Sequence, residues 1–460
     1  MQLPEDFLLG VATSSFQIEG ALDQDGRGPS IWDVFELANG DTGEKACDHY
    51  HLYREDVKLI KGLGASAYRF SIAWPRVVPD GEGKVNPKGL DFYSRLVDEL
   101  LEQEIEPWAT LYHWDLPLAL HEKGGWKSRE TALRFAEYTN HILDALGDRV
   151  KHWFTLNEPW CTAILGYQTG EHAPGERADT ATVLKIIHNL LLAHGYSLQQ
   201  IREAGDDHLA GIVLNPWIPL PLTESREDRE AAERAWQEQV GWWFEPLFEG
   251  HYPSNVKMIR QSEMPEILDG DLELISAETD FMGLNLYFPG FVRHAPEAAP
   301  FYYEECGSLV NLPRTEMGWH VYPPVLSYAL AQISKRYKPK AIYVTENGCA
   351  TPDLLDDRGG INDLFRKEYL RTHMLEALRS REQEGVPLKG YFVWSLMDNY
   401  EWQYGYSKRF GLVHVDYDTL ERTPKTSARW FAGLARKRRV DPWLHMETAA
   451  GPLVRRKQSG

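Results

Sequence analysis

The chain has 460 residues, of which 43% are hydrophobic and 12% aromatic, so it can bury a large core. Its formal net charge of −19 argues against a nucleic acid as partner, because binding that polyanion requires basic surface. The start, MQLPEDF, lacks a basic segment followed by an apolar run, and no stretch reaches about 18 uninterrupted apolar residues. We therefore expect a cytoplasmic protein without membrane attachment, acting on a neutral small molecule.

Neither the cysteines nor the histidines have metal-site spacing. Four cysteines are scattered without a C-x-x-C pattern, which is typical of reduced thiols: Cys47, Cys161, Cys306 and Cys349. The segment DHYH offers Asp48, His49 and His51, but neighbouring ligands without a third cluster predict local hydrogen bonding. The glycines lack phosphate-binding spacing as well. We expect neither a metal nor a cofactor.

Eight short apolar runs recur along the chain, each bounded by polar or turn residues. They cover 7–16, 67–74, 106–114, 152–159, 209–216, 280–287, 341–348 and 388–399. Such near-continuous hydrophobicity is typical of strands covered on both faces. Helical patterns lie between them: one opens at Asn86 and Pro87, and another runs from Ser128 to a C-cap at Gly147.

The alternation of strand and helix predicts the fold class α/β, as one closed (β/α)8 TIM barrel. A doubly wound open sheet is the alternative. No linker divides the chain, so we expect one domain over 1–445 and a flexible basic tail over 446–460. The stretches 288–318 and 350–362 read as long loops over the C-terminal mouth of the barrel.

Polar residues close several of these runs, and in a barrel the C-terminal strand ends converge on one mouth. Two of them are glutamates, Glu158 at the end of the fourth run and Glu346 at the end of the seventh. Either one alone could be a salt bridge or a helix cap. Two carboxylates facing each other suit glycoside hydrolysis, in which one protonates the departing oxygen and the other stabilises or captures the anomeric carbon.

Nine motifs in order resemble the family 1 glycoside hydrolases, the β-glucosidase family of retaining enzymes. They are ATSSFQIEGA, GRGPSIWDVF, ACDHYH, AYRFSIAWPR, LYHWDLP, TLNEP, YVTENG, VWSLMDNYEW and KRFGLVHVDY. The resemblance runs from about Phe7 to Tyr417. It implies that Glu158 is the general acid/base and Glu346 the nucleophile, that Arg69 lies beside the nucleophile, and that Tyr287 donates a hydrogen bond to it.

The resemblance also implies two groups of substrate contacts. The sugar would be held by Gln17, His113, Trp114, Asn157, Asn285, Trp394, Glu401, Trp402 and Phe410. The leaving group would pass Trp160, Leu165 and Trp319, which we interpret as an apolar funnel that favours aryl or short alkyl groups and weakens glucose inhibition. The sequence departs from the family pattern at His320 and at Gln403 and Tyr404, which bears on leaving-group preference.

The function implied is hydrolysis of terminal β-D-glucosyl residues from aryl or alkyl glucosides and cello-oligosaccharides, hence a part in cellulose degradation. β-Fucosides and β-galactosides are expected substrates too, because the 4-hydroxyl of either configuration meets Gln17 and Glu401. A 6-phospho-β-glycosidase and a non-catalytic sugar-binding barrel are the alternatives. Glu401 argues against the former, and the presence of both Glu158 and Glu346 argues against the latter. The sequence predicts no oligomeric state.

Overall fold

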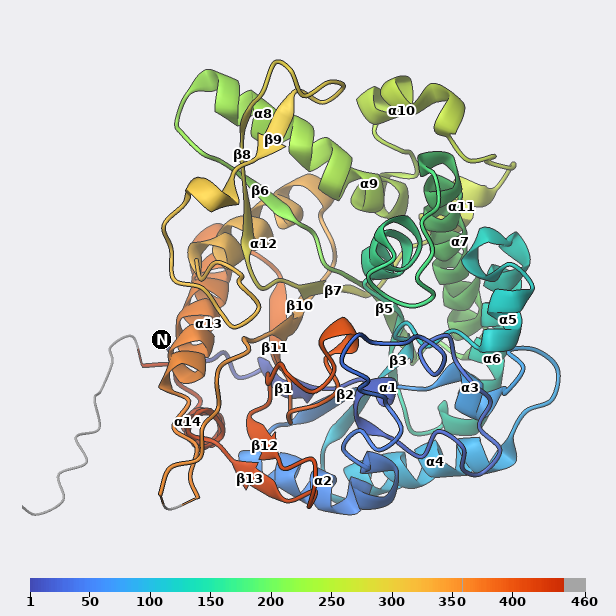
Figure 1. Cartoon of the computed structure of the whole chain (residues 1–460), viewed down its shortest axis with the longest axis vertical. Coiled ribbons are helices and arrows are strands. Elements are labelled where there is room, and N and C mark those ends of the chain that lie inside the picture. Colours follow the sequence, from blue (N-terminus) through green and yellow to red (C-terminus); the bar gives the residue numbers. More distant parts are fainter. Residues whose placement is uncertain (358, 442–460) are drawn as a thin grey trace, which may run out of the picture.

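The computed structural model describes residues 1–357 and 359–441, and these form a closed barrel of eight parallel strands (Figure 1). The strands are β1 (Leu8–Ala12), β2 (Ala67–Ser71), β3 (Glu106–Tyr112), β4 (His152–Asn157), β5 (Leu209–Leu214), β7 (Phe281–Asn285), β10 (Ile342–Asn347) and β11 (Leu388–Trp394). Each lies within one of the eight apolar runs, so the predicted barrel is confirmed and the open sheet is wrong. The tail expected over 446–460 lies outside the described residues.

Long helices connect the strands and cover the outside of the barrel (Figure 1). They are α2 (His49–Leu63), α4 (Pro87–Glu102), α6 (Arg129–Leu146), α7 (Thr180–Ala204), α8 (Arg226–Trp236), α9 (Trp242–Glu249), α12 (Pro324–Tyr337), α13 (Leu364–Glu384) and α14 (Thr426–Lys437). Shorter α-helices are α1 (Ser15–Ile18), α3 (Trp74–Val77), α5 (Leu118–Glu122), α10 (Ser254–Arg260) and α11 (Asp271–Ile275).

The two helices expected from the sequence form where predicted. Pro87 is the first residue of α4, where its missing N–H costs no helical hydrogen bond. Ser128 caps α6 by accepting a hydrogen bond from the Glu130 N–H. Gly147 is the C-cap of α6, but its φ of −67° is right-handed, so the left-handed conformation typical of a C-terminal glycine is not used here.

The segment 288–318 is more regular than expected. It contains β8 (Pro289–His294), which pairs in parallel with β6 (Ile218–Pro221), and β9 (Tyr303–Glu305), which pairs antiparallel with β8. Because β8 takes its partner from a segment about 70 residues earlier, no local pattern marks it. A second small sheet joins β12 (Val413–Val415) and β13 (Arg422–Pro424).

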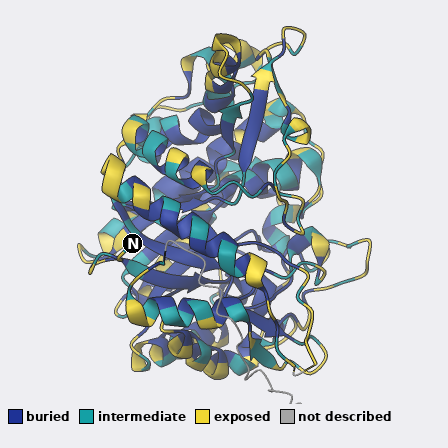
Figure 2. Cartoon of the chain, turned by 90° about the vertical axis from the view of Figure 1, so that its left-hand side faces the viewer, coloured by how far each residue is buried: buried dark blue, intermediate teal, exposed yellow. Residues whose placement is uncertain are grey.

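Aromatic side chains fill the inside of the barrel below the mouth. Trp108, Phe154, Phe281 and Phe392 pack together there, and the barrel strands are buried on both faces (Figure 2). Gly10 on β1 makes room for one of these rings, since a Cβ at this position would lie 2.3 Å from Phe392. The barrel is thus a packed core with its open end at the C-terminal mouth.

A buried ion network links the loop after β10 to the loop after β11. Lys425 Nζ lies 2.5 Å from Asp353 Oδ2 and 2.6 Å from Asp398 Oδ1, and all three side chains are at most 1% exposed. Arg366 at the start of α13 also pairs with Asp353, at 2.8 Å. The loop after β11 carries Glu401, Trp402 and Phe410, and the loop after β10 directly follows the strand that carries Glu346, so the network fixes these two parts of the site relative to one another.

Replacing Lys425 with methionine is expected to destabilise the protein by about 3–5 kcal/mol, because it leaves buried carboxylates without their cation. Thermal unfolding should show a clear drop in Tm. The matched control is Lys389→Met: that lysine is 42% exposed and pairs with Asp6 at the surface, where a salt bridge contributes about 0–1 kcal/mol. Equal Tm values for the two variants would contradict a structural role for the network.

None of the helices in the described residues is long and apolar enough to cross a membrane. The four cysteines are all buried, and none forms a disulfide.

Candidate active site

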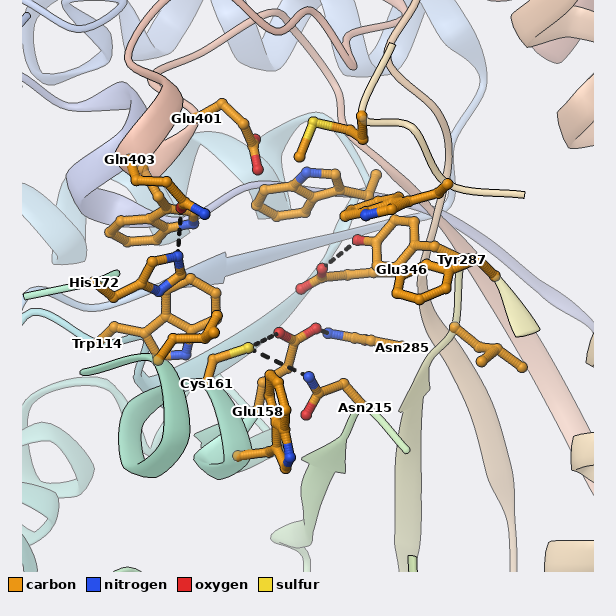
Figure 3. A pocket seen from close by; sticks show the side chains of 18 of the residues that line it. Trp114, Glu158, Cys161, His172, Asn215, Asn285, Tyr287, Glu346, Glu401 and Gln403 are labelled. Atoms are coloured by element: carbon orange, nitrogen blue, oxygen red, sulfur yellow. Dashed lines mark hydrogen bonds between the residues drawn. The ribbon is translucent and has the colours of Figure 1, made fainter. Parts of the chain in front are cut away.

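The C-terminal strand ends open into one cavity of about 300 Å³ (Figure 3). Thirteen of the sixteen predicted site residues line it: His113, Trp114, Glu158, Trp160, Leu165, Asn285, Tyr287, Trp319, Glu346, Trp394, Glu401, Trp402 and Phe410. The other three, Gln17, Arg69 and Asn157, are buried behind this lining. Arg69 and Asn157 form hydrogen bonds with the lining residues Glu346 and His113, and Gln17 donates to the carbonyl of Tyr400, the residue before Glu401.

Glu158 follows β4 and projects into the cavity (Figure 3). Its φ of +46° lies in the left-handed region, a strained conformation for a residue with a side chain. Asn285 Nδ2 donates to its Oε1 at 2.6 Å, and the Cys161 thiol donates to its Oε2 at 3.1 Å. Burial, and then the charge of Glu346, raise the pKa of Glu158 to about 8.

Glu346 has a cation in direct contact. Arg69 Nη1 donates to its Oε1 at 2.6 Å, and the Tyr287 hydroxyl donates to its Oε2 at 2.6 Å. Burial raises the pKa of Glu346, while Arg69 and Tyr287 act in the opposite direction. Because Glu158 has no such ion-pair partner, the proton of this coupled pair resides on Glu158 and the charge on Glu346.

Amide groups connect the two glutamates. Arg69 Nη2 donates to Asn157 Oδ1 at 2.6 Å, and Asn285 Nδ2 donates to the same oxygen at 3.1 Å. Since Asn285 also contacts Glu158, a continuous set of hydrogen bonds runs from one carboxylate to the other. This support fixes both acids before any ligand arrives.

Two polar groups at the deep end of the cavity are incompletely paired. His113 Nε2 accepts a hydrogen bond from Asn157 at 3.1 Å, but its Nδ1 is buried and has no partner among the described residues. The same holds for Oε2 of Glu401, whose pKa is raised to about 8 by burial and by the other two glutamates. Buried polar atoms normally have partners, so these two fit a ligand rich in hydroxyl groups.

Tryptophan rings flank these polar groups. The rings of Trp394 and Trp402 each lie 5.9 Å from the His113 ring and nearly parallel to it. Gln17 donates to the Tyr400 carbonyl at 2.8 Å and thereby holds the segment that carries Glu401. Apolar faces beside hydroxyl-binding groups match the two kinds of surface that a pyranose ring presents.

Some cavity residues escaped the sequence analysis. They include Cys161, Glu171, His172, Asn215, Trp217, Phe288 and Met317, while Gln403 and Tyr404 were noted there only as departures from the family pattern. Asn215 could have been found, because it closes the fifth apolar run as Asn157 closes the fourth. His320, which we connected with leaving-group preference, does not line the cavity and packs against Phe291 at 5.7 Å.

The histidines of the DHYH segment bond locally, as expected. His49 Nδ1 pairs with Asp56 at 2.8 Å, and His51 Nδ1 pairs with Asp48 at 2.5 Å. Among the described residues one group could bring three ligand atoms together, Glu245, Glu249 and His251, and it does not belong to the cavity.

A closed (β/α)8 barrel with a protonated and an ionised carboxylate facing one hydroxyl-binding cavity defines a glycoside hydrolase. Comparison with known proteins gives the family. The model of glycosyl hydrolase family 1 matches residues 1–440, and the chain belongs to that family.

Its relatives include enzymes of known name. The chain is 46% identical to a 1,4-beta-D-glucan glucohydrolase of Thermotoga neapolitana, over 94% of this chain and 98% of that protein. It is 42% identical to a bifunctional beta-D-glucosidase/beta-D-fucosidase of Bifidobacterium breve, over 94% and 97%. The structure of a beta-glucosidase from Thermotoga maritima in complex with deoxynojirimycin superposes with a TM-score of 0.91 at 45% identity, covering 96% of this chain and 100% of that one.

Proposed function

We propose that the protein is a retaining β-glucosidase that removes terminal β-D-glucosyl residues through a covalent glycosyl-enzyme. The observation that carries the proposal is the unequal pair of acids: Glu346 contacts Arg69, whereas Glu158 has only neutral partners. Double displacement needs this division, with a charged nucleophile and a protonated acid at the same moment.

In the first step Glu346 attacks the anomeric carbon while Glu158 gives its proton to the departing oxygen. Asn285 can only donate to Oε1 of Glu158, so the transferable proton sits on Oε2. As Glu346 forms its ester bond its charge disappears, and Glu158, now ionised, is free of that repulsion. The same glutamate then takes a proton from water, which attacks the ester and releases the sugar.

The deep end of the cavity supports an unphosphorylated sugar. No lysine or arginine of the described chain lines the cavity, so a phosphate dianion would find no cation there and would be repelled by ionised Glu346. Hydroxyl groups would instead pair with His113 and Glu401. These contacts do not distinguish an axial from an equatorial 4-hydroxyl, so we propose β-fucosides and β-galactosides as further substrates.

We also propose a place for the reaction. Cello-oligosaccharides are the proposed natural substrates, which gives the enzyme a part in cellulose degradation. A cytoplasmic location is supported by the four unpaired cysteines, because thiols stay reduced in that compartment.

A panel of nitrophenyl glycosides tests the proposal. We expect hydrolysis of the β-glucoside, with proton NMR showing β-glucose as the first product before mutarotation. Release of α-glucose would contradict double displacement. Binding of sugars without release of nitrophenol would favour a non-catalytic barrel, and hydrolysis only of 6-phosphoglycosides would favour the phosphate-specific alternative.

The Cys161 thiol gives a pH prediction. Its hydrogen bond stabilises ionised Glu158, so Cys161→Ala should raise the pKa of this acid further. Since kcat/KM falls when Glu158 loses its proton, the alkaline limb of the pH profile should move to higher pH. The other charged and titratable groups around Glu158 are the same in the variant and in the wild type: Arg69, Tyr287, Glu346 and Glu401. The control is Cys306→Ala, a buried cysteine outside the cavity. An identical alkaline limb in both variants would contradict the effect.

A further inference from the structure

The mouth of the cavity is more polar than the apolar funnel that we expected from the sequence. Beside Trp160, Leu165 and Trp319, its lining includes four polar side chains: Glu171, His172, Asn215 and Gln403. Exposure rises along one short segment from buried Trp402 through half-buried Gln403 to Tyr404, which is 37% exposed. Gln403 thus lies between the sugar-binding residue Trp402 and the exposed Tyr404, and we place it beside the leaving group of a bound glycoside.

A histidine that is distant in the sequence holds the side chain of Gln403. Its Oε1 lies 2.5 Å from Nε2 of His172, a residue 231 positions earlier (Figure 3). The His172 ring is buried against Trp32, Trp114 and Trp402, with centroids 5.3, 5.2 and 6.3 Å away. These rings prevent the imidazole from turning, so the position of its Nε2 is fixed.

The protonation of His172 determines what Gln403 presents to the cavity. Burial lowers the pKa of His172 to about 4, so the ring is neutral near pH 7. A carbonyl oxygen can only accept, so Nε2 of His172 carries the hydrogen. The amide nitrogen of Gln403 then points away from His172 toward the cavity, and among the described residues its side chain has no other hydrogen bond (Figure 3). Gln403 thus offers a fixed donor to whatever enters.

Acceptors accompany this donor. Asn215 Nδ2 donates a hydrogen bond to Cys161 Sγ at 3.3 Å, so the side-chain carbonyl oxygen of Asn215 is the atom that can accept one from a ligand. Glu171 adds an exposed carboxylate to the same lining. A sugar leaving group has hydroxyls that both accept and donate, whereas a phenyl ring has none. A site with a fixed donor loses that hydrogen bond when the ligand lacks a hydroxyl.

We propose that Gln403, fixed by His172, is a specificity-determining residue that favours a glycosyl over an aryl leaving group. This inference rests on the proposed β-glucosidase function and names its substrate class: short β-linked gluco-oligosaccharides. It also accounts for the large polar residue at a position where the family pattern has a small one.

The test compares kcat/KM for cellobiose and for 4-nitrophenyl β-glucoside in the wild type and in Gln403→Leu, which keeps the volume and removes both polar groups. Loss of one hydrogen bond should lower kcat/KM for cellobiose about 10-fold. The value for the aryl glucoside should stay within about 2-fold, because that leaving group never used the donor. Gln168→Leu is the matched control, an exposed glutamine at the end of the segment that follows Glu158 and outside the cavity lining.

An equal change for both substrates would overturn the inference and place Gln403 against the sugar that is cleaved. An unchanged cellobiose value would overturn it as well. Both outcomes leave the proposed function intact, since the wild type still hydrolyses both substrates. A wild type that hydrolyses neither would overturn the proposed function together with the inference.

Discussion

Replacing Glu346 with glycine is expected to lower kcat for an aryl β-glucoside by roughly 10⁴-fold or more, because it removes the carboxylate that forms the covalent intermediate. Arg69 and Tyr287 would keep their places and lose their shared partner. The space left by the carboxylate admits a small anion next to Arg69. Added azide should therefore attack the sugar directly and yield α-glucosyl azide, which NMR identifies.

Glu346→Gln is the control for this rescue. It removes the charge but fills the space, so it should be inactive both with and without azide. A β-glucosyl azide from Glu346→Gly would mean that the nucleophile is still present and that Glu346 has the other role.

Replacing Glu158 with alanine should have an effect that depends on the leaving group. For cellobiose, whose leaving hydroxyl must be protonated, we expect kcat/KM to fall by about 10²–10⁴-fold. A dinitrophenyl glucoside leaves without a proton, so its first step should be nearly unaffected. The second step lacks its base, and the product should therefore appear as a rapid burst followed by slow turnover.

Azide distinguishes the two glutamates again. In Glu158→Ala the intermediate still forms on Glu346, so azide should attack it from the opposite face and yield β-glucosyl azide. Equal losses on cellobiose and on the dinitrophenyl glucoside would contradict an acid role for Glu158.

The barrel could be predicted because its signals are local. Each strand is covered on both faces and therefore reads as a continuous apolar run, and its last residues turn polar at the mouth. The positions of Glu158 and Glu346 follow from that rule. The sheet formed by β6, β8 and β9 could not be predicted, because β8 pairs with β6 across a long sequence separation and both strands carry prolines.

More residues of the deep end of the site than of its mouth could be predicted from the sequence. Family motifs include Glu401 and Trp402, so the resemblance covered the sugar contacts. Whether a side chain faces the cavity or supports a neighbour depends on packing, which a motif does not specify. The sequence therefore did not predict that Arg69 and Asn157 lie behind the lining. The hydrogen bond between His172 and Gln403 joins two segments that are distant in the sequence, and neither segment alone predicts it.

The most direct test of the account is to trap the intermediate. A 2-deoxy-2-fluoro-glucoside with a good leaving group should inactivate the enzyme, because fluorine destabilises the cationic transition states and slows release of the ester. Mass spectrometry of the digested protein should then find one fluoroglucosyl group on the peptide that contains Glu346. A label on Glu158, or continued turnover without any label, would contradict the proposed double displacement.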